Sequence, residues 1–330
     1  MSRPGHQERG STGEVRGVTI AAMTDVVVPQ RTRIYQNHHL DSTRWDAFTH
    51  RPDDIVISTS YKAGTTWTQR IVSLLILGPG PLPPGGLNNV SPWIDARFFE
   101  PADAMCERLE AQTHRRFVKS HLAFDAIPYW DDVRYICVGR DTRDVFMSVF
   151  NHYSAYTDFM YQLLASGDPV GGPMPRCPED PRALWAEWMT TASFPWESDG
   201  SPWWSHHYHV ESFWKHKDLP NLLLVHYADM KADLEGEMRR IAGFLGLDIE
   251  ESLWPELVHG ASFESMRDEA KEGSGMEMVF EGGAERFFFK GTNGRWRDVL
   301  TAEDLELYER AASKLDPELR NWLENGRLGR

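Results

Sequence analysis

The segment 55–75, IVISTSYKAGTTWTQRIVSLL, constrains the fold more than any other part of the chain. A short apolar run leads into a small polar turn, and an apolar pattern at helical spacing begins at Thr65. This order predicts a strand, a glycine-containing loop and the start of a helix. The first backbone N–H groups of a helix lack internal partners, and the helix dipole adds to their attraction for anions. The segment therefore predicts a loop that wraps a phosphate group.

This loop differs from the ATP-binding pattern G-x-x-x-x-G-K-[ST]. Gly64 occupies the second glycine position, but Thr59 stands at the first. Thr65 stands where the lysine belongs, and the only lysine of the loop, Lys62, precedes Gly64. The pattern predicts a phosphate ligand that is not part of a magnesium-bound triphosphate.

The composition limits the class of protein. The chain has 330 residues, of which 41% are apolar, and it carries a formal net charge of −14. That charge argues against broad binding of nucleic acid or of an anionic membrane, so an anionic ligand needs a local basic pocket. Three cysteines without metal-ligand spacing favour a reducing compartment. With no secretory signal in view and no apolar run long enough for a membrane span, we expect a cytoplasmic protein.

Strand and helix patterns alternate along the chain. Strands are predicted at 54–59, 116–119, 133–138 and 221–226, and helices at 65–77, 143–161 and 234–245. This alternation predicts an α/β fold with a central, mostly parallel β-sheet and helices on both faces.

Polar, glycine-rich residues 1–24 are expected to be disordered, and 25–330 to form a single domain, because no repeat or clear linker interrupts them. Two stretches read as loops over a site: 78–89, rich in Pro and Gly, and 271–284, which is Gly-rich and acidic and is expected to be a mobile lid.

A second anion-binding feature lies at 133–153. An apolar strand ends in Gly139 and Arg140, where many magnesium–nucleotide enzymes carry an aspartate for the metal. A guanidinium at this point suits bidentate phosphate binding, and Ser148 follows two helical turns later. The alternative is a plain ion pair of Arg140 with Asp141 or Asp144.

Two further segments carry candidate chemistry. In 117–122, FVKSHL, an extended chain places Lys119 and His121 on one face, and histidine is the usual proton acceptor near neutral pH. In 287–296, FFFKGTNGRW, Lys290 and Gly291 can bind phosphate through an ammonium and a backbone N–H. A structural histidine and a solvent-exposed turn are the alternatives.

In this order, these segments resemble the cytosolic-type sulfotransferase family, which uses 3′-phosphoadenosine 5′-phosphosulfate (PAPS) and has a P-loop-NTPase-like fold. Residues 59–67, TSYKAGTTW, are similar to the family loop TYPKSGTTW, with substitutions around Ser60 and Tyr61. Residues 140–148 are similar to RNPKDVxVS, and 119–122 to KxHL, with Ala123 in place of a proline. Segments 200–210, 226–231 and 290–296 also look like family landmarks, so the resemblance runs from about residue 54 to the C-terminus.

The resemblance implies three catalytic residues. His121 would take the proton of the acceptor, Lys62 would stabilise the leaving oxygen, and Lys119 would neutralise charge on the moving sulfuryl group. The implied co-substrate is PAPS and the implied product is adenosine 3′,5′-bisphosphate (PAP), with no metal.

The resemblance also implies a nucleotide site. The 5′-phosphate would be held by the loop residues Lys62, Ala63, Gly64, Thr65 and Thr66. The adenine would contact Trp67, Phe263 and Tyr227, and the 3′-phosphate would be held by Arg140, Ser148, Lys290 and Gly291. The family has an arginine where this chain has Phe289, so either Arg286 or Arg295 replaces that contact or cofactor binding is weaker.

Six aromatic residues lie in segments that, by the resemblance, border the acceptor pocket: Trp93, Phe98, Phe99, Trp130, Tyr153 and Tyr156. They suggest a small hydrophobic or aromatic alcohol, a phenol or an amine as acceptor. A homodimer is a further open possibility.

Two other functions remain open at this point: a P-loop nucleotide kinase and a non-catalytic binder of adenosine bisphosphate. Thr65 and Arg140 argue against the kinase, and the pairing of Lys62 with His121 argues against the binder. A metal site at His206, His207 and His209 is disfavoured, because no further metal-ligand motif accompanies them. Trp203, Trp204, Phe213 and Trp214 read as core packing.

Overall fold

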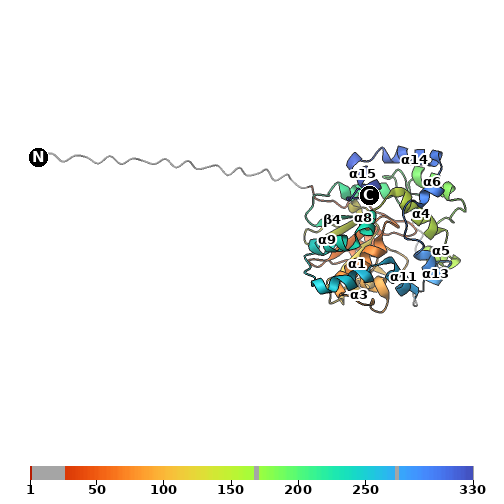
Figure 1. Cartoon of the computed structure of the whole chain (residues 1–330). Coiled ribbons are helices and arrows are strands. Elements are labelled where there is room, and N and C mark those ends of the chain that lie inside the picture. Colours follow the sequence, from red (N-terminus) through yellow and green to blue (C-terminus); the bar gives the residue numbers. More distant parts are fainter. Residues whose placement is uncertain (2–26, 167–170, 272–274, 330) are drawn as a thin grey trace.

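The structure is a computed structural model that describes residues 1, 27–166, 171–271 and 275–329 (Figure 1). The expected disorder of 1–24 therefore falls, apart from Met1, outside the described residues.

A four-stranded parallel sheet forms the centre of the fold. Its strands are β1 (Ile55–Thr59), β2 (Phe117–Ser120), β3 (Arg134–Gly139) and β4 (Leu222–His226), in the order β2-β1-β3-β4. Each of the four predicted strands is present within two residues of its predicted bounds. The predicted α/β class with a parallel sheet is confirmed.

The strand register brings the carboxyl ends of the strands to one edge. Ser58 of β1 lies opposite Ser120 of β2 and Cys137 of β3, while Gly139 lies opposite His226 of β4. The loops that follow β1, β2 and β3 therefore start side by side. These are the loops that carry the residues predicted to bind phosphate and move a proton.

Alternate residues of each strand face two different core layers. Ile55 and Ile57 pack with α1 (Thr65–Leu77), α9 (Leu234–Phe244) and α10 (Trp254–Gly260). On the opposite face, Val56, Tyr135 and Cys137 belong to a larger core. Helices α4 (Thr142–Tyr153), α6 (Pro181–Thr190) and α7 (His206–Trp214) supply part of that core.

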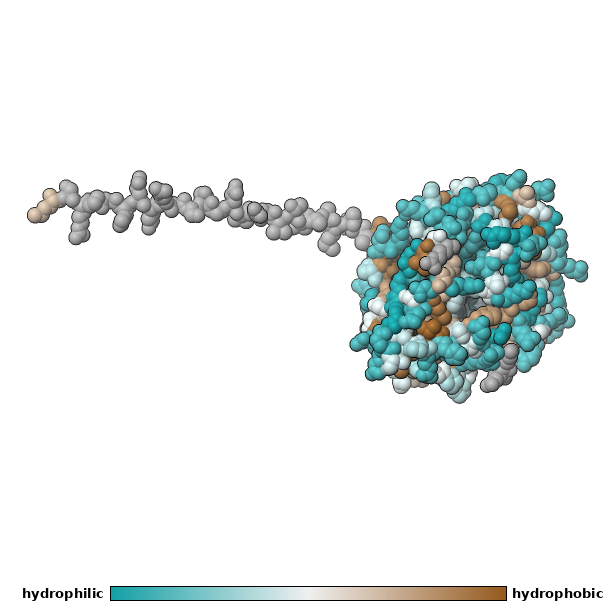
Figure 2. Space-filling view, viewed as in Figure 1, coloured by the Kyte–Doolittle hydropathy of each residue, from teal (hydrophilic) through white to brown (hydrophobic). Residues whose placement is uncertain are grey.

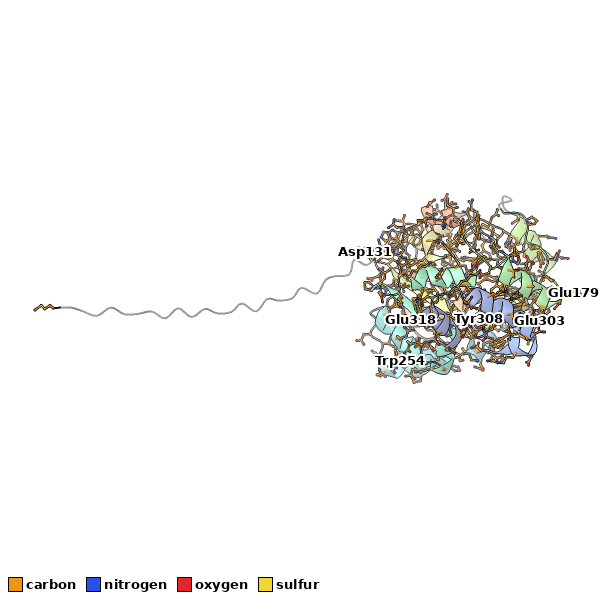
Figure 3. The ribbon with its side chains drawn as sticks, turned by 90° about the horizontal axis from the view of Figure 1, so that it is seen from above. Asp131, Glu179, Trp254, Glu303, Tyr308 and Glu318 are labelled. Atoms are coloured by element: carbon orange, nitrogen blue, oxygen red, sulfur yellow. The ribbon has the colours of Figure 1, made fainter. Side chains whose placement is uncertain are left out.

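The remaining helices surround these layers. In Figure 1, α14 lies near the C-terminus with α15 and next to α6, whereas α1 and α3 lie at the opposite side. Seen from above in Figure 3, Tyr308 of α14 lies between Glu303, near the start of the same helix, and Glu318 of α15. The bounds are α2 (Gly86–Val90), α3 (Ala102–Glu110), α5 (Asp158–Ala165), α8 (Tyr227–Ala232), α11 (Phe263–Lys271), α12 (Met276–Val279), α13 (Gly283–Phe287), α14 (Ala302–Ala312) and α15 (Pro317–Asn325).

The predicted helix 143–161 is wrong at 154–157, where the structure has a break between two helices. Helix α4 ends at Tyr153, and a new helix, α5, begins at Asp158. Thr157 is extended, and its hydroxyl accepts a hydrogen bond from the backbone N–H of Met160, which makes it the N-cap of α5. A helix periodicity that continues across the break concealed this cap.

The two stretches expected to be loops contain short helices. Helix α2 occupies the end of the stretch 78–89. In the stretch 271–284, the described residues contain α12 and the start of α13, and Phe280 is buried between them. The mobility of this segment stays a prediction, and residues 272–274 lie outside the described part.

A substitution at Gly139 can test how closely α15 packs against the end of β3. A Cβ at this position would lie 2.3 Å from the ring of Trp322, far inside contact distance. We expect Gly139→Ala to destabilise the protein by about 1–3 kcal/mol through overpacking. Urea unfolding monitored by circular dichroism would measure this as a lower midpoint at an unchanged slope.

Gly243→Ala is the matched control, because a Cβ at Gly243 of α9 meets nothing within 4 Å. Alanine in a helix is favoured over glycine, so this variant should be at least as stable as the parent protein. Equal stability of Gly139→Ala and the parent would show that Trp322 is not held against the strand.

Candidate active site

A cavity of about 510 Å³ opens at the carboxyl edge of the sheet. Every predicted catalytic and nucleotide-binding residue except Ala63 lines it. Ala63 is fully buried behind the loop. The cavity is also lined by residues that were not predicted to bind ligand, among them Tyr61, Asn151, His152, Lys231, Phe287, Phe288 and Thr292.

The loop between β1 and α1 is built as an anion cradle. Gly64 is the N-cap of α1 with φ 126°, and no side-chain hydrogen bond caps this first turn. A Cβ at Gly64 would lie 3.1 Å from the ring of Tyr227, so a larger residue would be strained and crowded. Lys62 has φ 64°, a left-handed conformation that is unusual for a lysine. The backbone N–H groups at the start of α1 are therefore free to bind a phosphate.

His121 is held with one ring nitrogen free to accept a proton. Its Nδ1 lies 2.7 Å from the carbonyl oxygen of Thr59. Because a carbonyl can only accept, Nδ1–H is the donor and the lone pair of the neutral ring is on Nε2. Burial, and then the charge of Lys119, hold the pKa of His121 well below its usual range. The imidazole is therefore neutral near pH 7.

Lys119 and Asp95 lie beside this histidine. The ammonium of Lys119 lies 4.5 Å from the ring centroid of Trp93, and burial lowers its pKa to about 8 against the opposing effect of Asp95. Asp95 accepts hydrogen bonds from the indole N–H of Trp93 at 2.6 Å and from the backbone N–H of His121 at 3.1 Å. Asp95 thus fixes the ring and the backbone that frame the base.

Lys62 lines the same cavity as His121. Its Nζ is 3.3 Å from Nδ1 of His152 and 4.1 Å from the ring centroid of Phe287. Burial, followed by the charges of Lys119 and Arg140, lowers the pKa of Lys62 to about 7. A bound anion would favour the charged form and raise this pKa.

Arg140, directly after β3, also lines the cavity. Its guanidinium donates to the carbonyl oxygen of Lys62 at 3.3 Å and to Oδ1 of Asn293 at 3.1 Å. Its Nε is buried without a hydrogen-bond partner among the described residues. Of the two ion-pair partners considered from the sequence, Asp141 is paired instead with Arg143, and Asp144 accepts a hydrogen bond from the backbone N–H of Gly294 at 2.7 Å.

Aromatic rings follow along the cavity wall. The indole N–H of Trp67 donates to the carbonyl oxygen of Ala261 at 2.8 Å, and the ring of Tyr227 meets it edge-on at 5.3 Å. A Cβ at Gly291 would lie 3.0 Å from the ring of Phe263, so the backbone there rests against this ring. Lys231 donates to the carbonyl oxygen of Gly291 at 2.7 Å and holds the loop in place.

Two arginines flank Phe289. The guanidinium carbon of Arg295 lies 5.3 Å from the Phe289 ring centroid and that of Arg286 lies 5.7 Å away. Arg295 lines the cavity, and its Nε is buried without a partner among the described residues. Arg286 donates to the hydroxyl of Ser154 at 3.0 Å. Unfilled donors on Arg140 and Arg295, together with the free N–H groups of α1, fit a ligand with two separate phosphate groups.

The six predicted acceptor residues do not line this cavity, but most of them border it. Trp93 meets His121 edge-on at 4.7 Å, and Phe98 packs on Trp93. Tyr156 is 3.0 Å from the hydroxyl of Tyr61, and Tyr153 is buried against Tyr156. Figure 2 shows a mostly hydrophilic surface on which hydrophobic residues gather in separate patches.

The remaining two residues predicted to border the acceptor pocket are Phe99 and Trp130. Phe99 packs on Phe98 but is 56% exposed. Trp130 is not brought to this group: it stacks on His50 at 4.6 Å and packs with Trp45 and Phe48.

Sequence reasoning missed Tyr61, His152, Asn293 and Asp95. His152 had a usable signal, because it follows Ser148 by four residues and so lies on the same face of α4. Tyr61 interrupts the phosphate loop, where it was noted only as a departure. Asp95 and Asn293 come from loops, and nothing in their sequence context distinguishes them from surface residues.

The three histidines of α7 make hydrogen bonds to segments that carry the site. Nε2 of His206 lies 2.9 Å from the carbonyl oxygen of Arg140, and Nε2 of His209 lies 3.0 Å from the hydroxyl of Ser58. His207 bonds to Thr142 and Asp199, each at 3.0 Å. Each is thus used in a hydrogen bond to an element of the site. Among the residues described here, no group of three or more His, Cys, Asp or Glu side chains is placed to hold a metal ion.

Within the described part of the chain, no helix is both long enough and apolar enough to cross a membrane. The tryptophans read from the sequence as core are buried, except for the half-buried Trp214.

Comparison with known proteins gives a consistent result. Residues 52–317 match the sulfotransferase domain family. A glycolipid sulfotransferase of Mycobacterium tuberculosis is 34% identical over 327 residues, which cover 93% of this chain and 97% of that protein. Sulfotransferase 1B1 of Canis lupus familiaris is 26% identical over 272 residues, covering 80% and 83%.

Two crystal structures share the fold. Mouse sulfotransferase SULT7A1 complexed with PAP superimposes with a TM-score of 0.63 at 22% identity, covering 84% of this chain and 91% of that one. Retinol dehydratase in a complex with retinol and PAP has a TM-score of 0.63 at 22% identity, covering 82% and 83%.

The two arginines beside Phe289 make separate predictions for PAP binding. We expect Arg295→Ala to weaken PAP binding about ten- to hundredfold, because a charge-assisted hydrogen bond contributes roughly 1.5–3 kcal/mol. Phe289→Arg should add little, since Arg295 already supplies the guanidinium. Calorimetric titration with PAP measures both.

Arg286→Ala is the matched control, because Arg286 flanks the same ring but is bonded to Ser154. Its PAP affinity should stay close to that of the parent. Weakening by Arg286→Ala and none by Arg295→Ala would reverse the assignment.

Proposed function

The chain belongs to the sulfotransferase domain family, as its motifs predict, and we propose that it moves a sulfuryl group from PAPS to a hydroxyl group of a small hydrophobic or aromatic acceptor. PAP is the second product. The observation that carries this proposal is that one cavity is lined by His121, Lys119 and Lys62. The free Nε2 of His121 and the ammonium of Lys62 line the same cavity as the phosphate loop.

The proposed chemistry needs one base and local positive charge. The acceptor hydroxyl gives its proton to Nε2 of His121, and its oxygen attacks sulfur in line. The new oxygen–sulfur bond forms as the bond between sulfur and the bridging phosphate oxygen breaks. Lys62 stabilises the negative charge on that oxygen and Lys119 the charge on the sulfuryl oxygens. Such a reaction depends on positioning and on preorganised charge.

The buried donors at the nucleotide end support PAPS as the co-substrate. The N–H groups of α1 would hold the 5′-phosphate, and Arg140, with Arg295, would hold the 3′-phosphate. Trp67, Tyr227 and Phe263 offer rings to the adenine. Ser148 and Lys290 line the same end of the cavity.

The acceptor side favours an amphiphilic alcohol. The base lies against Trp93, on which Phe98 packs, and the apolar rings of Phe287 and Phe288 line the cavity. A related protein at 34% identity is named a glycolipid sulfotransferase, which supports an acceptor with a hydroxyl head and a lipid tail. Phenols and amines are the other classes to include in an acceptor screen with labelled PAPS.

We also infer that residues 25–330 act as one sulfotransferase domain, since the larger core includes residues from Tyr35 to Ala312. The cytoplasmic location and the homodimer stay predictions.

Removal of the base gives the direct test of this function. We expect His121→Ala to lower kcat on a neutral alcohol by about 10²–10⁴-fold, the usual contribution of general base catalysis. PAP affinity should stay nearly normal, as measured by calorimetry. A phenol that is already ionised at the assay pH should be affected less.

His259→Ala, which changes an exposed histidine of α10, is the control and should keep full activity. Near-full activity of His121→Ala on the alcohol would refute the assignment of the base. Transfer of a phosphoryl group from magnesium–ATP, with none of sulfuryl from PAPS, would favour the kinase.

The pH profile follows from the two lowered pKa values. His121 must be neutral, and because its pKa is well below 6.5, the acid limb of kcat/KM should lie below pH 6.5. Lys62 must be charged, and because burial lowers its pKa to about 7, kcat/KM should fall as pH rises above about 7. PAPS raises this pKa when bound, so the alkaline limb of kcat should lie at higher pH.

Lys62→Arg separates the two limbs. A guanidinium stays charged throughout the accessible range, so the alkaline limb should disappear while the acid limb stays. An alkaline limb that persists in Lys62→Arg would have to be assigned to another group, such as Lys119.

A further inference from the structure

A continuous chain of buried hydrogen bonds ends at Lys62. Nε2 of His38 lies 2.9 Å from the carbonyl oxygen of Pro202, and Nδ1 of His38 is bonded to Nδ1 of His39. Nε2 of His39 lies 3.4 Å from the hydroxyl of Tyr156.

The chain continues from Tyr156 to the active site. Its hydroxyl is 3.0 Å from that of Tyr61, which is 2.6 Å from Nε2 of His152. Nδ1 of His152 is then 3.3 Å from Nζ of Lys62. Both His38 and His39 are buried, as are His152 and Tyr156.

The direction of every bond in this chain is determined. The carbonyl oxygen of Pro202 can only accept, so Nε2 of His38 carries the proton and Nδ1 accepts. His39 must then donate from Nδ1 and accept at Nε2. Tyr156 donates to His39 and accepts from Tyr61. Both histidine rings are neutral, because burial lowers the pKa of His38 to about 4 and holds that of His39 well below its usual range.

The tautomer of the last ring, His152, follows in the same way. The hydroxyl of Tyr61 is used as a donor to Tyr156, so its oxygen accepts from Nε2–H of His152. Burial holds the pKa of His152 well below its usual range, so this ring is neutral and Nδ1 presents a lone pair. Among the described residues, the partner of that lone pair is the ammonium of Lys62, which can only donate.

We propose that His152 is a positioning residue for the ammonium of Lys62, and that the chain through Tyr61, Tyr156, His39 and His38 fixes the ring tautomer that makes this possible. The proposal rests on the proposed function, in which Lys62 stabilises the leaving oxygen. The hydrogen-bond chain orients the ammonium of Lys62 and does not carry its proton away, because the pKa of His38 lies below that of Lys62.

Several groups face Lys62 and set its charge together with His152. Lys119 from β2 and Arg140 from the end of β3 repel it. The neutral ring of His121 and the ring of Phe287 from α13 also face it. A hydrogen bond to Nδ1 of His152 favours the charged form of Lys62 against this repulsion.

Nuclear magnetic resonance of protein labelled with ¹⁵N-histidine tests the tautomers directly. The expected result is Nε2–H for His152 and His38, and Nδ1–H for His39, with assignments from single substitutions. Tyr61→Phe keeps a ring stacked on Trp203 but removes the acceptor of Nε2–H, so His152 should become a mixture of tautomers. An Nδ1–H tautomer of His152 in the parent, or no change in Tyr61→Phe, would overturn the proposal.

Tyr135→Phe is the matched control. Tyr135 is a buried tyrosine of β3 that takes no part in the hydrogen-bond chain. Its hydroxyl donates to the carbonyl oxygen of Pro128 at 2.9 Å. This variant should leave the tautomer of His152 and the transfer activity unchanged.

Two substitutions at His152 separate positioning from packing. The amide oxygen of His152→Asn can take the place of Nδ1 as acceptor, whereas His152→Leu has no acceptor. We expect His152→Leu to lower kcat about tenfold with little change in the KM for PAPS, and to lower the pKa of Lys62 measured by NMR. His152→Asn should restore most of both. Equal behaviour of the two variants would overturn the proposal.

The positioning role of His152 and the proposed sulfuryl transfer can fail separately. If the tautomers are as expected but no sulfuryl group is transferred from PAPS to any acceptor, the proposed function fails and the hydrogen-bond chain stands. If transfer occurs and His152 has the other tautomer, the positioning role fails alone.

Discussion

The parallel pairing of β1 with both β2 and β3 is the constraint on which the site depends. In this register Ser58 lies opposite Ser120 and Cys137, so three loops leave the sheet at one level. The phosphate loop, His121 and Arg140 each follow one of these strands within three residues. A slip of one residue would turn every strand side chain to the other face and would separate the base from the lysine.

Burial gives this site its chemical character. Lys62 and Lys119 are held in an apolar environment that lowers the pKa of both, to about 7 and about 8. The chain as a whole carries a net charge of −14, yet the cavity brings together the basic residues Lys62, Lys119, Arg140 and Arg295. Buried cations are costly without a partner, and an anionic ligand removes much of that cost. The same burial keeps His121 neutral and able to accept a proton.

Support for the site comes largely from histidines. Those of α7 bond to the ends of β1 and β3, and His38 and His39 belong to the hydrogen-bond chain that ends at Lys62. A neutral imidazole has one donor and one acceptor, so it can join two fixed groups in one direction. This property explains why buried histidines are used here where apolar residues would leave polar loop atoms unpaired.

Local sequence was sufficient for the strands, for α1 at its observed bounds and for the residues that line the nucleotide end of the cavity, because these follow from periodicity and from the order of the motifs. Local sequence was insufficient where contacts from distant segments decide. The cap at Thr157 ended a helix that periodicity continued, and Trp130 packs against Trp45 and His50 instead of the acceptor wall. Only the tertiary structure joins His38, 114 residues before His152, to the lysine of the phosphate loop, because a hydrogen bond depends on distance in space and not on separation along the chain.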